Sequence, residues 1–262
     1  MLECVVNISE GRDRSTIAAI ADAAGPALLD LHTDPDHHRS VLTLLGEQAP
    51  RAVAAQAVAL LDLRRHEGAH PRIGVVDVVP FVPLDDATAA DAVTARDAFC
   101  RWAADELGLP CFRYGPERTL PEVRRGAFAA FGPDAGPPDP HPSAGAVAVG
   151  ARPLLVAYNV WLAAADLEAA RHIASALRGP TVRALGLAVG DRVQVSMNLI
   201  DPLVTGPGAV VDAVAALAPI AGCELVGLVP TAVLEAEDPR RWGDLDLGPD
   251  RTIEARRAAA GG

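Results

Sequence analysis

The sequence predicts an α+β protein made of two tandem βαββαβ units, each an antiparallel sheet backed by helices. Two observations predict this fold class. Strand-like apolar runs alternate with segments of helical periodicity along the whole 262-residue chain, and the same order of elements occurs once before and once after a Pro/Gly-rich stretch. Half of the residues are hydrophobic, which is enough to bury a substantial core.

The first half contains the elements of one complete βαββαβ unit. Short apolar runs predict its strands, and apolar residues spaced by three and four predict its helices. A further helix at about 86–107 and a strand at 111–114 extend this half. The predicted elements of the unit are a strand at 2–6, a helix at about 15–24, strands at 27–32 and 40–46, a helix at about 49–65 and a strand at 75–82.

A Pro/Gly-rich stretch separates the two halves. Residues 131–142 contain five prolines and two glycines, so we predict a loop and a boundary there. The charged tail after Pro230 is expected to be a peripheral extension. The second half repeats the order of the first, with a strand at 154–161, a helix at 166–177, strands at 181–189 and 192–200, a helix at about 208–217 and a strand at 224–229.

The basic residues exclude several kinds of chemistry. All 23 are arginines, and the chain has no lysine. A Schiff base to pyridoxal phosphate and a phosphate-binding loop of the Gly-Lys-Ser/Thr type are therefore excluded. Anions must instead be bound by arginine, backbone N–H groups or helix N-termini. The net charge of −11 argues against a nucleic-acid-binding surface.

Cysteine spacing and the N-terminal sequence predict a cytoplasmic protein. The four cysteines are far apart with no Cys-x-x-Cys pair, which argues against a zinc ribbon or a disulfide framework. The first residues lack the basic and apolar regions of a signal peptide. Residues 145–165 are long and apolar enough to suggest a membrane span, but Arg152, Pro153 and Asn159 interrupt them. We therefore expect buried strand there and no membrane association.

The most informative polar segment is Arg-Arg-His-Glu-Gly-Ala-His-Pro-Arg-Ile-Gly at 64–74. His66 to His70 matches the His-Glu-x-x-His motif of zinc peptidases, which requires both histidines on one continuing helix. Gly68 and Pro71 oppose a helix here, so we expect a loop and no metal. In such a loop His70 is suited to proton transfer near neutral pH, although an ordinary solvated histidine is the alternative.

Two further polar segments lie at the ends of predicted strands. Asn-Ile-Ser-Glu-Gly-Arg at 7–12 follows the first strand, and Asp-Pro-Asp-His-His-Arg-Ser-Val at 34–41 leads into the third. Both are rich in turn residues, so ordinary connections would look similar. In a split βαββαβ unit, however, such loops can lie close together. The residues that this arrangement would bring into one cleft are Asn7, Glu10, Arg39 and His70.

These segments resemble the formiminotransferase domain of glutamate formimidoyltransferases, a family that includes the bifunctional formimidoyltransferase-cyclodeaminases. The resemblance covers about residues 1–230, and several of the motifs are long. They stand at residues 3–12, 34–41, 66–74, 77–83, 150–152, 157–160, 194–199 and 226–230.

The resemblance implies a fold, a reaction and a set of residues. The fold is two ferredoxin-like subdomains, here 1–152 and 153–262, usually in a homodimer. The reaction transfers a formimino group from N-formimidoyl-L-glutamate to N5 of tetrahydrofolate, the co-substrate. The family's catalytic histidine precedes Pro-Arg and corresponds to His70, which would act as base and then acid. Within the matching stretch 136–145, the expected folate-binding residues are Gly136, Pro137, Ser143, Ala144 and Gly145.

Both implied substrates carry carboxylates, which arginine can bind through two parallel hydrogen bonds. Arg39, Arg72 and Arg152 are the candidates, and each could instead form a structural ion pair. Asp36 or Glu10 would orient His70. The expected substrate-binding residues are Asn7, Glu10, Asp36, Arg39, Arg72 and Arg152.

The chain departs from the family pattern in several places, including a segment at 114–133 that is shorter than in the bifunctional relatives and an abbreviated end beyond Pro230. His38 stands where the family usually has asparagine, and the folate segment is rich in proline with few residues able to stack on a pterin. Two alternatives therefore stay open beside zinc hydrolysis. One is a folate-binding homologue without transferase activity, and the other is a transferase that uses a different formimino or one-carbon donor.

Overall fold

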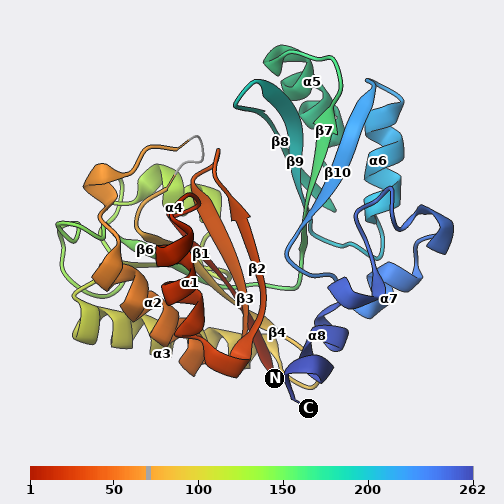
Figure 1. The fold of residues 1–262 in the computed structure, drawn as a ribbon. Helices are drawn as coiled ribbons and strands as arrows, with labels where there is room; N and C mark the ends of the chain where they lie inside the picture. The colour runs from red at the N-terminus through yellow and green to blue at the C-terminus, as the bar shows by residue number, and fades with distance from the viewer. Residues whose placement is uncertain (69–71, 262) are drawn as a thin grey trace. The chain divides into compact units, whose positions relative to one another are not determined.

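The structure is a computed structural model that describes residues 1–68 and 72–261. The chain divides into two compact units, Met1–Pro153 and Leu154–Gly262, and each contains a sheet with helices (Figure 1). In the described part of the chain, no helix is long and apolar enough to cross a membrane.

The N-terminal unit is built on one mixed sheet. Its elements in chain order are β1 (Leu2–Ile8), α1 (Arg14–Asp22), η1 (Gly25–Ala27), β2 (Leu28–Asp34), β3 (Arg39–Leu45), α2 (Gln48–Leu60), η2 (Leu63–Arg65), β4 (Val76–Pro83), α3 (Ala89–Leu107), β5 (Cys111–Tyr114), α4 (Leu120–Gly126) and β6 (Val147–Ala151). The strand order is β2-β3-β1-β4-β6-β5. The first four strands are antiparallel neighbours, and β6 pairs in parallel with both β4 and β5.

The central strands of this sheet are buried on both faces. Helix α3 packs against β4, β5 and β6, while α2 packs against β1, β3 and β4, over the main apolar core. On the other face, Val78, Phe112 and Val123 form a smaller cluster beneath α4. Burial on both faces explains why β4 is almost continuously apolar. Its one charged residue, Asp77, is 1% exposed.

Capping residues set the ends of two helices in this unit. Thr88 and Asp91 form a reciprocal capping box at the start of α3, and Gly108 ends that helix with a φ of 61°. Thr119 and Glu122 form the same capping box at the start of α4. The short helix α4 escaped the sequence analysis, and it carries Arg124 toward the sheet, where the side chain reaches Asp77.

The C-terminal unit has a four-stranded antiparallel sheet in the order β10-β7-β9-β8. Helix α5 packs against β8 and β9, and α6 packs against β7 and β10. The elements are β7 (Val156–Leu162), α5 (Leu167–Leu177), β8 (Val182–Val189), β9 (Arg192–Leu199), α6 (Pro207–Ala215), β10 (Ile220–Val226), α7 (Thr231–Glu235), η3 (Pro239–Arg241), η4 (Pro249–Arg251) and α8 (Ile253–Ala260).

The predicted α+β class is confirmed. Each unit contains strands and helices in the order βαββαβ, and in each the fourth strand of that order lies beside the first. This arrangement is consistent with two ferredoxin-like subdomains. The predicted boundary at 131–142 is wrong, because β6 returns after that stretch to pair with β4 and β5, so the stretch belongs to the N-terminal unit.

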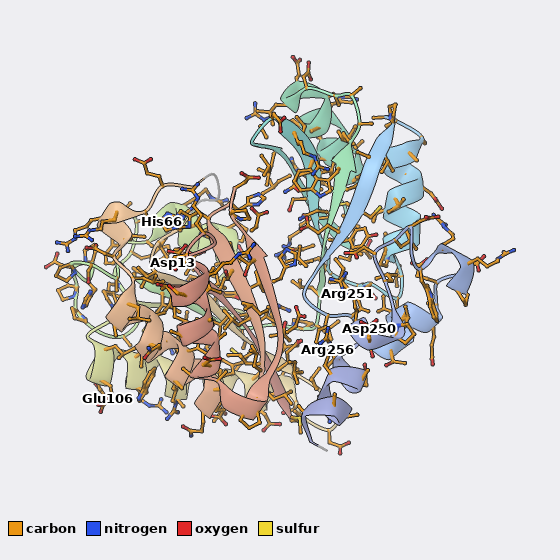
Figure 2. All side chains as sticks on the ribbon, in the orientation of Figure 1. Asp13, His66, Glu106, Asp250, Arg251 and Arg256 are labelled. Atoms are coloured by element: carbon orange, nitrogen blue, oxygen red, sulfur yellow. The ribbon has the colours of Figure 1, made fainter. Side chains whose placement is uncertain are left out.

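The prediction of a peripheral C-terminal tail is also wrong. Leu234, Leu245 and Leu247 are buried in the core of the C-terminal unit. The buried Tyr158 hydroxyl donates a hydrogen bond to the Leu245 carbonyl oxygen at 2.6 Å. Arg251, labelled in Figure 2, donates to the carbonyl oxygen of Leu225 in β10 at 2.9 Å. Sequence composition could not reveal this, because Leu245 and Leu247 are single apolar residues between aspartate or glycine neighbours.

Because the tail completes a core, Leu245→Ala is expected to lower the free energy of unfolding by about 2–5 kcal/mol, as large-to-small substitutions in cores do. Leu203→Ala is the matched control, since Leu203 is 62% exposed and Leu245 is 1% exposed. Leu203→Ala is expected to change the free energy of unfolding by no more than about 0.5 kcal/mol. Urea denaturation of both variants measures the difference, and equal stabilities would contradict this account of the tail.

Candidate active site

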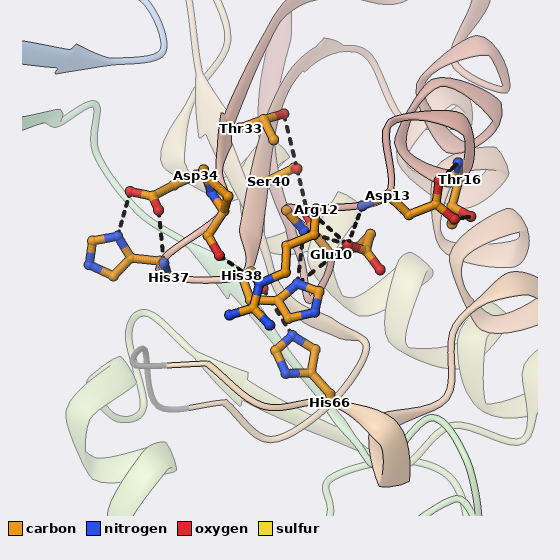
Figure 3. Close-up of polar contacts among 12 residues, drawn as sticks. Glu10, Arg12, Asp13, Thr16, Thr33, Asp34, His37, His38, Ser40 and His66 are labelled. Atoms are coloured by element: carbon orange, nitrogen blue, oxygen red, sulfur yellow. Dashed lines mark hydrogen bonds and ion pairs between the residues drawn. The ribbon is translucent and has the colours of Figure 1, made fainter. Parts of the chain in front are cut away.

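One end of the N-terminal sheet brings three polar loops together. Strand β1 lies between β3 and β4, and Asn7 is opposite Val41 on one side and Val78 on the other. The loop after β1, the turn before β3 and the segment before β4 therefore emerge at the same end of the sheet. This places Asn7 beside Arg39, and Glu10 beside Ser40, the residue that follows Arg39. Figure 3 shows Glu10, Ser40 and His38 at this end of the sheet.

Glu10 organises the loop after β1. Its Oε1 accepts hydrogen bonds from the backbone N–H groups of Gly11 at 2.9 Å, Arg12 at 2.7 Å and Asp13 at 3.0 Å. The hydroxyl of Ser40 donates to the Glu10 carbonyl oxygen at 2.6 Å, which fastens this loop to β3. The Glu10 side chain is thus a structural centre of the loop as well as a polar group at the site.

The turn between β2 and β3 is built on Asp34. Its Oδ1 accepts the backbone N–H groups of Asp36 and His37, both at 2.8 Å, and its Oδ2 lies 2.6 Å from Nδ1 of His37. Burial raises the pKa of Asp34, but the hydrogen bonds from His37 more than offset it and leave that pKa below its usual value. Asp36 is exposed within this turn.

His38 presents a neutral imidazole to the site. Its φ of 50° lies in the left-handed region, where asparagine, aspartate and histidine are enriched. Its Nδ1 accepts the backbone N–H of Gly11 at 3.1 Å. Burial, with a contribution from His66, lowers the pKa of His38 below its usual value. A neutral ring that accepts at Nδ1 carries its proton on Nε2.

His66 packs against His38, with ring centroids 4.1 Å apart and the rings tilted by 33°. Its Nε2 lies 2.9 Å from the His38 carbonyl oxygen, and the guanidinium of Arg72 contacts the ring nitrogens. Burial is the main cause that lowers the pKa of His66. His66 follows η2 with φ and ψ of −96° and 125°, so it does not lie on a helix as the zinc peptidase motif requires. His70, the predicted catalytic residue, lies outside the described residues.

A pocket of about 200 Å³ opens beside the two imidazoles. Figure 2 shows two of its lining residues, Asp13 and His66, at the same end of the unit. The lining is largely polar and combines three carboxylates with two histidines and one arginine. The lining residues are Glu10, Asp13, Thr16, His38, Leu60, Leu61, Asp62, Arg65 and His66.

An arginine cluster lies at the start of β4. Arg39 donates from Nε to Asn7 Oδ1 at 3.1 Å and from Nη1 to Asp77 Oδ2 at 2.9 Å. Arg124 contacts both Asp77 oxygens, at 3.2 and 2.6 Å. Burial lowers the pKa of Arg72; the charge of Asp77 acts in the opposite direction, and the charge of Arg124 acts in the same direction as burial.

The sequence analysis missed Asp77 and Arg124 as site residues. One signal for Asp77 was present, because a single carboxylate in an apolar strand buried on both faces needs a cationic partner. Arg124 had no comparable signal, since α4 was not predicted. His38 was noted only as a departure from the family pattern, and His66 only as part of a rejected zinc motif.

The structure does not bring Arg152 to this cluster. Arg152 follows β6, and its backbone N–H donates to the carbonyl oxygen of Phe81 at 3.1 Å. Phe81 stands four residues after Asp77 on β4, which corresponds to about 13 Å along a strand. The side chain of Arg152 donates to the carbonyl oxygen of Pro153 at 3.0 Å and lies near Tyr114.

The predicted folate-binding residues fall in two places. Ser143, Ala144 and Gly145 lie against the segment before β4: the Ser143 carbonyl oxygen accepts the Leu63 N–H at 2.7 Å, and Gly145 forms an antiparallel bridge with Gly74. Gly136 and Pro137 are exposed near the start of β5, where Gly136 approaches the Leu109 carbonyl oxygen. The first group thus borders the loop that carries His66 and Arg72, and the second does not.

Comparison with known proteins gives the site a context. Residues 1–152 match the family model of the formiminotransferase domain, N-terminal subdomain. Glutamate formimidoyltransferase from Streptococcus pyogenes is 37% identical over 232 residues, which cover 77% of this chain and 78% of that protein. Glutamate formimidoyltransferase from Thermoplasma acidophilum is 36% identical over 76% of each chain. Formimidoyltransferase-cyclodeaminase from Sus scrofa is 35% identical over 89% of this chain, but the match spans only 51% of that protein.

Imidazoles and guanidiniums are groups suited to moving protons and to binding small anions. The matched region contains every loop that builds this site in the N-terminal unit. The chain belongs to the formiminotransferase family.

Gly11→Ala is expected to disrupt the contact between the loop after β1 and the turn before β3. A methyl group on Gly11 would lie 2.1 Å from the Asp34 carbonyl oxygen and 2.5 Å from the Arg39 nitrogen, so backbone must move. We expect a loss of about 1–3 kcal/mol in the free energy of unfolding, as for overpacked interiors. Gly179→Ala is the control, because nothing lies within 4 Å of its added methyl. Chemical denaturation measures the free energy of unfolding of both variants. An equal loss in the two would contradict the close contact of Gly11 with the turn before β3.

His38 and His66 are expected to titrate below the usual imidazole pKa of about 6.5. Two-dimensional NMR of the imidazole C–H groups measures this, with His38→Asn and His66→Asn used to assign the signals. Because the folded-state pKa is depressed, the unfolded chain takes up these protons first as the pH falls. The stability contribution is therefore full above about pH 6.5 and is lost as the pH falls through the folded pKa values. A pKa above 6.5 for both imidazoles would contradict the conclusion that both rings are neutral at neutral pH.

Proposed function

We propose that this protein is a glutamate formimidoyltransferase, which moves the formimino group of N-formimidoyl-L-glutamate to N5 of tetrahydrofolate. The observation that carries the proposal is the 37% identity to the Streptococcus pyogenes glutamate formimidoyltransferase over 78% of that protein. The polar site at the end of the N-terminal sheet lies within the region that matches the family model. Within this proposal, residues 1–152 and 153–262 are the two subdomains.

The reaction requires two proton movements. N5 of tetrahydrofolate attacks the formimino carbon and must lose its proton, and the glutamate nitrogen leaves and must gain one. A histidine whose pKa lies near the working pH can perform both steps in turn, first as base and then as acid. His70 is our candidate: it stands two residues from Gly68 and from Arg72 in the sequence, and both of these contact the site. A histidine can accept the N5 proton only while its imidazole is neutral.

The substrates also carry carboxylates that need cationic partners. Arg39 and Arg72 lie at the described site and are suited to this role. Asn7 and Glu10 hold the adjoining loops, and Asp36 lies in the turn that carries His38. Arg152 is included on the family resemblance alone, because it lies farther along the sheet.

Tetrahydrofolate enters this proposal as a co-substrate. Ser143, Ala144 and Gly145 border the loop before β4, which supports a role for this end of the folate segment. Gly136 and Pro137 are carried as folate-binding residues on the family resemblance alone. A homodimer and a cytoplasmic location belong to the proposal in the same way.

Turnover with tetrahydrofolate and N-formimidoyl-L-glutamate tests the proposal. We expect the wild type to form 5-formimidoyltetrahydrofolate, and His70→Ala to lower kcat by about 10²–10⁴-fold, the usual contribution of a general base. His172→Ala is the control, because His172 is an exposed histidine of the C-terminal unit. Absence of turnover by the wild type would overturn the activity, and full activity of His70→Ala would overturn the assigned residue. Tetrahydrofolate binding without turnover of any formimino donor would favour a binding homologue instead.

A further inference from the structure

The pocket beside the two imidazoles contains hydrogen-bonding groups that the fold does not use. It has a volume of about 200 Å³ and is lined by three carboxylates, two imidazoles and one guanidinium. A donor or acceptor that is already bonded within the chain has little capacity left for a ligand. The lining groups that lack such a bond therefore indicate what the pocket can bind.

Two of the three carboxylates are committed to the chain itself. Asp13 caps α1: its Oδ1 accepts the backbone N–H groups of Ser15 and Thr16 at 2.9 and 3.2 Å, and its Oδ2 accepts the Thr16 hydroxyl at 2.7 Å. Hydrogen bonds from Ser15 and Thr16 lower the pKa of Asp13 to about 2. Asp62 pairs with Arg64 and accepts its Nε at 2.8 Å and its Nη2 at 2.6 Å.

Glu10 differs from these two because only one of its oxygens is used. Oε1 accepts three backbone N–H groups and lies 3.3 Å from His38 Nδ1 (Figure 3). Oε2 has no hydrogen-bond partner among the residues that the structure describes. The side chain is 14% exposed and lines the pocket. Glu10 thus offers a ligand one carboxylate oxygen, and the bonds to its other oxygen hold it in place.

The two imidazoles differ in the same way. Both ring nitrogens of His66 have contacts, since Nε2 lies 2.9 Å from the His38 carbonyl oxygen and the guanidinium of Arg72 contacts the ring nitrogens. His38 accepts the Gly11 N–H at Nδ1, so its neutral ring carries a proton on Nε2. Within residues 1–68 and 72–261, this Nε2–H has no acceptor. His38 therefore offers the pocket one N–H donor.

The guanidinium of the lining belongs to Arg65. Its side chain is exposed and forms no ion pair with another described residue. The groups available to a ligand are therefore one carboxylate oxygen, one neutral N–H donor and one positive charge. A small ligand that satisfies all three carries a cationic N–H group close to a carboxylate.

We propose that this pocket binds the head group of an N-formimidoyl amino acid, in which a formamidinium stands one carbon from the α-carboxylate. Glu10 Oε2 accepts a formamidinium N–H, His38 Nε2 donates to the α-carboxylate, and Arg65 neutralises the charge of that carboxylate. The inference rests on the proposed function and specifies which part of the formimino donor this pocket recognises. It makes Glu10 a binding residue in addition to its structural role in the loop after β1.

The competing account is that Glu10 only holds the loop after β1. A purely structural glutamate would affect stability when replaced, but it would not distinguish a charged nitrogen from an oxygen at one position of a ligand. N-formimidoyl-L-glutamate and N-formyl-L-glutamate make this distinction. They share both carboxylates and differ in that the terminal imino nitrogen of the first is an oxygen in the second.

Calorimetric titration with both ligands, in the absence of tetrahydrofolate, provides the test. We expect the wild type to bind N-formimidoyl-L-glutamate about tenfold or more tightly, as for a hydrogen bond to a charged group. Glu10→Gln is expected to lose most of this preference, because it removes the charge and retains an oxygen for the backbone N–H groups. Glu67→Gln is the matched control, since Glu67 is exposed and does not line the pocket. It should keep the preference.

Arg65→Gln tests the carboxylate contact. Both ligands carry the α-carboxylate, so we expect this variant to weaken both alike, by about two- to fivefold, as for an exposed ion pair. Arg14→Gln is the control, because Arg14 is exposed, lies in the same unit and does not line the pocket. It should bind both ligands as the wild type does.

Three results would overturn the subsite. They are equal affinity of the wild type for the two ligands, an unchanged preference in folded Glu10→Gln, and unchanged binding of both ligands by Arg65→Gln. The last result decides the matter if Glu10→Gln does not fold. Binding is measured without turnover, so a wild type that shows the preference but no transfer refutes the proposed activity alone. Transfer without the preference refutes only the subsite.

Discussion

The carboxylate of Asp77 is the contact on which the functional end of the N-terminal sheet depends. It joins β4 to Arg39 at the start of β3, to Arg124 on α4 and to the backbone of Ile73 before β4. Removing one partner of such a buried network typically costs about 3–5 kcal/mol, because the remaining charges lose their compensation. The same network fixes two guanidiniums at the site. Stability and the electrostatic character of the site therefore have one origin.

Close backbone packing then determines the protonation of the histidines. A side chain on Gly11 would collide with the Asp34 carbonyl oxygen, and one on Gly68 would collide with the His37 carbonyl oxygen, so the three loops touch through their main chains. This contact brings His38 and His66 together and removes water from their rings. Desolvation disfavours the charged imidazolium, and the nearby arginines act in the same direction. Loop packing thus prepares neutral rings beside a cationic cluster.

The sequence was most informative where a pattern repeats and least informative where a single distant residue completes a contact. Short apolar runs and helical spacing predicted most strands and the long helices of both units, although β6 was not among the predicted strands. Turn residues located the loops that meet near Asn7 and Arg39. The partner of Asp77 could not be found in this way, because Arg124 lies 47 residues away on a seven-residue helix with almost no periodicity. The prediction of a peripheral tail was wrong for the same physical reason. Isolated leucines such as Leu245 become part of the core only through tertiary contacts.

The absence of lysine fits this arrangement. A buried ammonium group beside other cations readily loses its proton, because desolvation and repulsion both lower its pKa. Burial lowers the pKa of Arg39 as well, but the pKa of a guanidinium starts far above neutrality, so Arg39 stays charged at neutral pH. The positive charge of the cluster consequently persists across the range in which His38 and His66 change protonation. Between about pH 5 and 8, the protonation of His38 and His66 can therefore change while the guanidiniums of the cluster stay charged.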